Sequence, residues 1–251
     1  MGKENEADKL LRRIERRFVK GMVTYGLLED GDKVLVGLSG GKDSMALLEL
    51  LARRSRIFHP RFEVVAAHVQ MRNIGYQSDT DYLRAFAGSL EVPFLTYEAG
   101  FDASADRRES PCFLCSWNRR KALFTLAQEH SCNKIALGHH MDDILETLLM
   151  NLTFQGAFSS MPPKLVMRKF PMTVIRPLCL VPEAELTELA ELRGYRKQEK
   201  ACPYETRSHR ADMKNILRQL EAMNPEARYS LWGSMTNVQT ELLPTPCSPE
   251  R

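Results

Sequence analysis

A short segment near the start of the chain, VLVGLSGGKDS at 34–44, combines the residue types that bind phosphate groups. An apolar, β-prone run leads into two glycines and a lysine, and an apolar helical pattern follows, so we expect a strand, a tight turn and a helix start. The first turn of a helix offers unpaired N–H groups and a partial positive charge, to which lysine adds a full charge. The glycines let the backbone approach the anion closely. The candidate phosphate-binding residues are Leu38, Ser39, Gly40, Gly41, Lys42, Asp43 and Ser44.

The lysine of this turn is followed by an acidic residue, Asp43. The turn is therefore not a Walker A loop, in which Ser or Thr follows the lysine directly. Because a carboxylate next to phosphates repels them unless a cation lies between, Asp43 predicts a bound Mg²⁺. The alternative is an ordinary strand-to-helix turn, in which a lysine and an aspartate have little packing use.

Two cysteines, Cys112 and Cys115, form a CxxC pattern ahead of a basic run at 119–121. We expect a turn that brings both thiols to one side, where nearby cations and a helix N-terminus favour the thiolate forms. Thiolates bind soft metals and iron–sulfur clusters. A zinc half-site, a redox pair and two packed thiols are the alternatives. Cys202 lies in a polar segment and is the best candidate for a third ligand.

Alternating strand and helix patterns must position these residues. Strands alternating with helices imply parallel βαβ units, and hence an α/β fold with a twisted parallel sheet and helices on both faces. The segments 100–111 and 155–170 show no period and are predicted to be irregular. The expected strands are 34–38, 62–69, 93–97, 134–138 and 174–175, and the expected helices are 6–27, a helix from 43 onward, 79–90, 118–130, 142–152, 182–193, 208–223 and 225–236.

The residues that could do chemistry follow the ends of three expected strands. Ligands of such sheets bind outside the carboxyl ends of the strands, so we expect one nucleotide site there. A helix cap formed by Asp142 is compatible with this site, while His139 and His140 beside it are an alternative metal pair. Besides the phosphate-binding turn, the candidate residues are His68, Gly138, Asp142 and Asp143.

The 251 residues carry a net charge of only +3. The kind of binding partner must therefore be inferred from where the charges lie rather than from their sum. Basic residues gather at 9–20 and 53–61, and such patches suit either a polyanion such as RNA or a solvated helix face. The length suits one large domain. We expect this domain at 29–238, with a basic helix at 1–28 packed on it and a loose tail at 239–251.

The cysteine count and the apolar pattern indicate a compartment. Six cysteines are too few for a disulfide scaffold in a chain of this length, and neither a secretory leader nor a membrane-spanning run is visible. We therefore expect a cytoplasmic protein with no membrane partner, in which clustered cysteines bind metal or catalyse. Cys132 and Cys179 lie in or beside apolar segments and are expected in the core.

The sequence SGGKDS at 39–44 matches the pyrophosphate-loop signature of the N-type ATP pyrophosphatases. Together with four further segments in the same order, it resembles the tRNA 2-thiocytidine synthetase family, the cytidine-thiolating branch of these enzymes. The resemblance extends over about residues 9–238. The matching segments are 37–44, 111–120, 134–148, 161–165 and 175–178.

This resemblance implies a Rossmann-like fold of the adenine nucleotide alpha hydrolase type and an adenylating tRNA sulfurtransferase. ATP is cut between its α and β phosphates, and AMP is placed on the base oxygen of the cytidine at position 32 of the anticodon loop. Sulfur then replaces that oxygen. The implied partners are tRNA and a sulfur donor system such as a cysteine desulfurase, and a homodimer is one option for the assembly.

The resemblance also implies roles for single residues. Lys42 would offset charge on the departing pyrophosphate, and Arg119 would stabilise the activated base or the leaving AMP. A [4Fe–4S] cluster with one iron left free for sulfur would be bound by three cysteines. The implied catalytic residues are Lys42, Asp43, Arg119 and Asp143; the implied ATP contacts are residues 38–44, His68, Gly138 and Asp142; the cluster ligands are Cys112, Cys115 and Cys202; the Mg²⁺ ligands are Asp43 and Asp143.

Three alternatives stay open. The family pattern has a second CxxC around the third ligand, whereas no cysteine follows Cys202 three residues later. The first alternative is therefore a related enzyme that thiolates another substrate. An adenylating enzyme with an amine acceptor and a zinc site is the second alternative. The third is a nucleotide-binding module without turnover, against which Lys42 and Asp43 argue, because binding alone needs less charge beside the phosphates.

Two aromatic residues of the CxxC segment, Phe113 and Trp117, have two interpretations. We expect them to pack in the core, and stacking on a nucleic-acid base is the alternative. A further set of basic residues suits an RNA-binding face or a solvated one. These residues are Lys164, Arg168, Lys169 and Arg176.

Overall fold

The computed structural model describes residues 2–72, 79–100, 111–168, 170–196 and 209–244. The chain forms two compact units, one of residues 1–144 with 162–207 and one of residues 145–161 with 208–251. The phosphate-binding turn lies in the first unit. The domain boundaries expected after residues 28 and 238 stay predictions.

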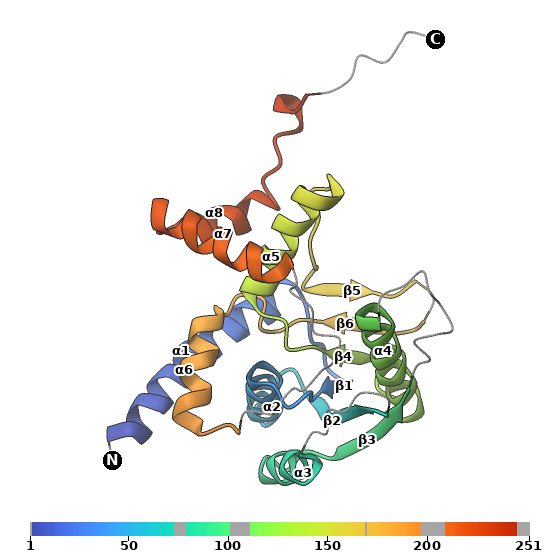
Figure 1. The fold of residues 1–251 in the computed structure, drawn as a ribbon. Helices are drawn as coiled ribbons and strands as arrows, with labels where there is room; N and C mark the ends of the chain where they lie inside the picture. Colours follow the sequence, from blue (N-terminus) through green and yellow to red (C-terminus); the bar gives the residue numbers. More distant parts are fainter. Residues whose placement is uncertain (1, 73–78, 101–110, 169, 197–208, 245–251) are drawn as a thin grey trace. The chain divides into compact units, whose positions relative to one another are not determined.

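A six-stranded sheet forms the centre of the first unit, with the strand order β3-β2-β1-β4-β6-β5 (Figure 1). Neighbouring strands are parallel except β5, which runs antiparallel to β6. The chain moves from β1 outward to β3 and then returns to place β4 on the other side of β1, which creates a crevice at the carboxyl ends of these two strands. The α/β fold expected from the sequence is therefore confirmed. The strands are β1 Asp32–Gly37, β2 Phe62–Met71, β3 Phe94–Ala99, β4 Lys134–Ala136, β5 Lys164–Val166 and β6 Thr173–Ile175.

Helices cover both faces of the sheet because successive strand residues point to opposite sides. Val34 and Val36 of β1 lie in one buried cluster with α1, α2, α3 and α6, whereas Leu35 lies in a second cluster with α4. Figure 1 shows α4 on the opposite face of the sheet from α2. The central strands are thus apolar on both faces, as parallel strands between two helical layers require. The helices are α1 Gly2–Thr24, α2 Lys42–Ser55, α3 Thr80–Ser89, α4 Pro111–Glu129 and α6 Glu183–Arg193.

Two expectations about local structure are wrong. Helix α4 begins at Pro111, seven residues before the predicted start at 118, so both CxxC cysteines lie within a helix rather than in a turn. Proline is well suited to a first helical position, where its missing N–H is no loss. The segment 155–170, predicted to be irregular, contains the edge strand β5, whose mostly exposed residues carry no alternating apolar pattern.

The second unit is helical. Helix α5, Met141–Met150, begins in the first unit and ends in the second, where the π-helix η1 continues it over Asn151–Gln155. Helix α7, His209–Met223, lies against α8, Ala227–Ser234, and a short 3₁₀ helix η2 follows at Thr240–Leu242. Among the residues that the structure describes, no helix has both the length and the apolar character needed to cross a bilayer.

A buried ion pair joins the amino ends of β1 and β4. The Lys134 ammonium is 2.6 Å from an Asp32 carboxylate oxygen, and both side chains are buried. The same ammonium donates a hydrogen bond to the Leu27 carbonyl at 2.9 Å, and the Asn133 amide donates to the other Asp32 oxygen at 2.7 Å. Each charge is therefore paired and hydrogen-bonded, which is the condition under which buried ions are tolerated.

The substitution Lys134→Met is expected to lower the free energy of unfolding by about 3–5 kcal/mol, because Asp32 then keeps a buried charge without its counter-ion. The matched control is Lys33→Met, since the neighbouring Lys33 forms an exposed ion pair with Glu63 at 3.7 Å, and exposed pairs contribute less than about 1 kcal/mol. Urea denaturation followed by Trp117 fluorescence, in a background that carries Trp232→Phe, measures both losses. Equal losses in the two variants would contradict this account.

Candidate active site

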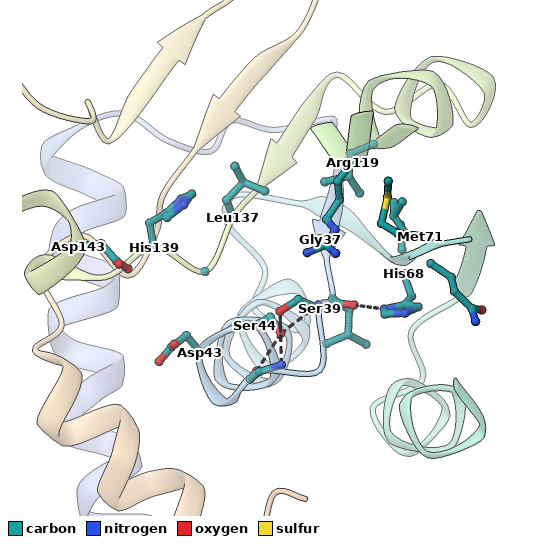
Figure 2. A pocket seen from close by; sticks show the side chains of 17 residues that line it. Gly37, Ser39, Asp43, Ser44, His68, Met71, Arg119, Leu137, His139 and Asp143 are labelled. Atoms are coloured by element: carbon teal, nitrogen blue, oxygen red, sulfur yellow. Dashed lines mark hydrogen bonds between the residues drawn. The ribbon is translucent and has the colours of Figure 1, made fainter. Parts of the chain in front are cut away.

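A cavity of about 290 Å³ lies at the carboxyl ends of β1, β2 and β4 (Figure 2). It is bounded by the turn after β1, the last residues of β2, the turn after β4 and one side of α4. The position agrees with the ligand site expected for a parallel sheet of this topology. Of the residues singled out in the sequence, those that line this one cavity are Leu38, Ser39, Gly41, Asp43, Ser44, His68, Arg119, Gly138, His139 and Asp143.

Two serine hydroxyls hold the phosphate-binding turn in shape. The Ser44 hydroxyl donates to the Gly41 carbonyl at 2.8 Å and accepts from the Ser39 backbone N–H at 3.2 Å. The Gly41 N–H in turn donates to the Ser39 hydroxyl at 3.3 Å. Gly40 has a φ of +82°, a conformation that side-chain-bearing residues rarely adopt. The turn is therefore arranged by its own side chains to present backbone at the start of α2.

Gly138, in the turn after β4, packs directly on the start of α2. A Cβ atom at this position would come within 3.0 Å of the Ser44 backbone nitrogen and 3.1 Å of the Asp43 carbonyl carbon. Few side chains approach backbone so closely, so a larger residue here would require the start of α2 to shift by a few tenths of an ångström. The contact brings the strand ends of β1 and β4 together around the cavity.

Lys42 is held between two carboxylates. Its ammonium is 3.0 Å from Asp43 and 3.3 Å from Glu183, the first residue of α6. Burial by itself would lower the pKa of Lys42, but the two carboxylates outweigh burial and raise the pKa above its ordinary value. Lys42 and Gly40 do not line the cavity themselves. Glu183 lies 141 residues away in the sequence, and the helical pattern around it indicated no such pairing.

The buried imidazole of His140 lies between the carboxylates of Asp43 and Asp143. Its Nε2 atom is 3.4 Å from an Asp143 oxygen and 4.0 Å from an Asp43 oxygen, and the His140 backbone N–H donates to Asp143 at 3.1 Å. Both carboxylates line the cavity and supply hard oxygen donors of the kind that Mg²⁺ prefers. Asp142 instead accepts a hydrogen bond from the Glu183 backbone N–H at 2.8 Å, at the start of α6, and does not line the cavity.

His68 presents one ring nitrogen to the cavity. Its Nδ1 atom is 2.8 Å from the Leu38 carbonyl, so Nδ1 carries the proton and donates it (Figure 2). Its Nε2 atom is buried and has no hydrogen-bond partner among the described residues. Burial lowers the pKa of His68, and the positive charge of Arg119 lowers it further. The ring is therefore neutral near pH 7, with Nε2 as a free acceptor.

Helix α4 connects the cavity to the cysteine pair. Arg119 lines the cavity, and its guanidinium is 3.9 Å from the half-buried thiol of Cys115, one helical turn earlier. Cys112 belongs to the preceding turn of the same helix, while Cys202 lies outside the described residues. Within the described ranges, no group of three or more His, Cys, Asp or Glu side chains is placed to bind a metal ion. His139 and His140 lie within these ranges and form no such group with their neighbours.

Other expectations about side chains have clear outcomes. Cys132 and Cys179 are buried, as predicted, and burial raises the pKa of the Cys179 thiol to about 12. The expected core packing of Phe113 and Trp117 is wrong, since 45% and 48% of their surfaces are exposed. They lie on the side of α4 that turns away from the sheet, which the apolar pattern alone does not distinguish from the buried side.

Comparison with known proteins agrees with this geometry. The PP-loop domain family matches residues 9–221. The tRNA-cytidine(32) 2-sulfurtransferases of Geotalea daltonii and Syntrophotalea carbinolica are each 36% identical to this chain; the alignments cover 92% of it and 94% and 91% of the two relatives. The structure of the U34-tRNA thiolase NcsA from Methanococcus maripaludis with its [4Fe–4S] cluster superposes with a TM-score of 0.76 at 27% identity, over 96% of this chain and 83% of that one. The chain therefore belongs to the PP-loop family and, within it, to the tRNA-cytidine(32) 2-sulfurtransferases.

Proposed function

We propose that this enzyme thiolates C2 of the cytidine at position 32 of tRNA in an ATP-dependent reaction that passes through an adenylated base. The observation that carries the proposal is a single cavity lined both by the phosphate-binding turn and by Arg119, on the helix that bears Cys112 and Cys115. Adenylation and sulfur transfer act on the same base, so their groups must converge on one place. The names of the bacterial relatives support the substrate, and the archaeal thiolase supports a cluster-dependent reaction.

The chemical problem is that the base oxygen is a poor leaving group. Transfer of AMP to this oxygen turns it into a phosphate ester, which departs readily. In this proposal the turn at 39–44 binds the pyrophosphate part of ATP through its backbone N–H groups, and Lys42 offsets the charge that develops as pyrophosphate leaves. The His68 Nε2 atom, a buried acceptor, contacts the adenosine part together with the turn at Gly138.

The residues present fit the two inorganic groups that the family implies. Asp43 and Asp143 are the candidate Mg²⁺ ligands, because both carboxylates line the cavity and a bound Mg²⁺ would neutralise phosphate charge. Cys115 lies next to the Arg119 guanidinium, a neighbour that favours the thiolate required for cluster binding. A [4Fe–4S] cluster on Cys112, Cys115 and Cys202 would supply an open iron for sulfide. A donor such as a cysteine desulfurase delivers persulfide sulfur, which a two-electron reductant such as a thiol must first reduce to sulfide.

Arg119 has a role of its own in this proposal. Its Nε atom is buried without a hydrogen-bond partner among the described residues, and the side chain lines the cavity. A buried guanidinium donor with unused capacity is suited to an oxygen that gains negative charge. We assign Arg119 to the bridging oxygen of the adenylated base, where it would stabilise AMP as the leaving group.

The direct test is thiolation of tRNA by the protein purified without oxygen. With ATP, Mg²⁺, sulfide and an unmodified tRNA transcript, we expect release of pyrophosphate and formation of 2-thiocytidine at position 32, measured by mass spectrometry of the digested nucleosides. A transcript with uridine at position 32 is the matched control. Formation of a thiouridine at position 34 instead would refute cytidine 32 as the substrate and indicate the substrate named for the Methanococcus maripaludis thiolase, U34 of tRNA. Zinc in place of iron, with an amine incorporated, would refute it.

The substitution Cys115→Ser is expected to remove the iron and the acid-labile sulfide, about four of each per chain in the parent protein. Binding of ATP, measured by isothermal titration calorimetry, is expected to persist because Cys115 does not line the cavity. Cys247→Ser, in the tail, is the matched control and should keep its full iron content. A cluster retained in the Cys115→Ser protein would refute the assignment of this ligand.

The substitution Lys42→Ala is expected to slow tRNA-dependent pyrophosphate release by about 100-fold or more, the usual effect of removing one group that stabilises developing charge. The iron content should stay unchanged, since Lys42 contacts Asp43 and Glu183 rather than α4. Lys33→Met, which removes an exposed lysine near the amino end of β1, is the control. Normal turnover by Lys42→Ala would exclude the proposed role.

A further inference from the structure

The solvent-facing side of α4 carries large aromatic and basic side chains. Phe113 is 45% exposed and Trp117 is 48% exposed, although large aromatic side chains are normally well buried. Spacings of three and four residues place them on one face of the helix with further exposed residues. We use the term aromatic–basic stripe for Phe113, Ser116, Trp117, Arg120 and Lys121, all of which are exposed.

The aromatic–basic stripe lies immediately beside the cavity. Arg119 lines the cavity (Figure 2). The next residue of the same helix, Arg120, is exposed. Trp117 and Lys121 lie within one helical turn of Arg119 on either side. A polymer with one unit bound in the cavity would therefore have its neighbouring units within reach of the stripe.

The charge of this helix is entirely positive until its last residue. Glu129 is the first acidic residue of α4, while Arg119, Arg120 and Lys121 are consecutive. The Lys121 ammonium lies over the Trp117 ring, 5.5 Å from its centre, and 48% of the Trp117 side chain remains exposed. Such a combination suits a ligand that has both flat rings and negative charge.

Another cation of the same unit, Arg176, is buried. Arg176 follows β6; its Nη1 atom donates to the Pro162 carbonyl at 2.6 Å, but its Nε atom has no partner among the described residues. Burial lowers the pKa of Arg176, and the like charge of Arg120 lowers it further. The charge of Arg176 adds to the positive potential around Arg120, which favours a phosphate group on this side of α4.

We propose that the aromatic–basic stripe binds the unpaired nucleotides of the tRNA loop while the target base occupies the cavity. Bases stack on Trp117 and Phe113, and the backbone phosphates of these nucleotides lie near Arg120 and Lys121. Sequence-tolerant stacking on exposed aromatic rings beside cations is characteristic of single-stranded nucleic-acid recognition, whereas a duplex surface needs no such rings. This inference rests on the proposed tRNA substrate and adds the surface that presents it.

The test uses binding of an RNA stem-loop with the anticodon-loop sequence to the protein purified with its cluster. Trp232→Phe leaves Trp117 as the sole tryptophan, and RNA is expected to quench its fluorescence. Trp117→Ala should weaken binding by about 5- to 100-fold, from the loss of base stacking, while Trp117→Phe should stay within about threefold. Arg120→Ala should lower the slope of log Kd against log salt by about one.

Phe58→Ala is the matched control. Phe58 is another exposed aromatic residue, 63% exposed with the Arg61 guanidinium 4.3 Å from its ring centre, but it precedes β2 at the opposite end of the sheet from the cavity. Its loss should change RNA affinity by less than about twofold, since exposed surface away from the ligand contributes little. Retained ATP binding establishes that each variant is folded.

The outcomes separate this inference from the proposed function. Parent protein that does not bind the stem-loop would refute the tRNA substrate itself. Parent protein that binds, with equal affinities for Trp117→Ala and Phe58→Ala, would refute only the role of the aromatic–basic stripe. Unchanged RNA affinity together with an altered oligomeric state of Trp117→Ala would assign the stripe to a contact between copies of the chain, and the inference would fall.

Discussion

The active site depends on the close approach of Gly138 to the first turn of α2. A Cβ atom at this position would lie 3.0–3.2 Å from backbone atoms of Asp43 and Ser44, so a side chain would push the two segments apart. The contact joins the two strand ends on either side of the switch in strand order, β1 and β4, and so creates the crevice in which the cavity lies. The N–H groups of α2 and the carboxylates of Asp43 and Asp143 then line one space, although about a hundred residues separate them in the sequence.

A charged network extends from this contact to α6. Asp142 accepts a hydrogen bond from the Glu183 backbone, the Glu183 carboxylate pairs with Lys42, and Lys42 pairs with Asp43. His140 then lies between Asp43 and Asp143. Each charged group of the phosphate-binding turn thus has a counter-charge within the protein, and the network gives Asp142 a structural task that is separate from the cavity.

Helix α4 combines three functions because a helix has distinct faces. Its inner side packs on the sheet through Leu123, Leu126 and Ala127, and Arg119 reaches the cavity. Its early turns carry the cysteine pair, and its outer side presents the aromatic–basic stripe. The proposed adenylation, sulfur transfer and RNA binding therefore share one rigid element, which would hold a bound base in register with both reactive centres.

The α/β fold, the phosphate-binding turn and the strand ends at which a ligand is expected can be predicted from the amino-acid sequence, because apolar periodicity and glycine placement are local signals. It also indicated His68, Arg119 and Asp143, which do line the cavity. Three features became visible in the folded chain alone: Glu183 pairs with Lys42, Asp142 faces α6, and Trp117 is half exposed rather than packed in the core. These depend on contacts between distant segments and on which face of a helix meets the sheet, and neither is encoded in the spacing of neighbouring residues.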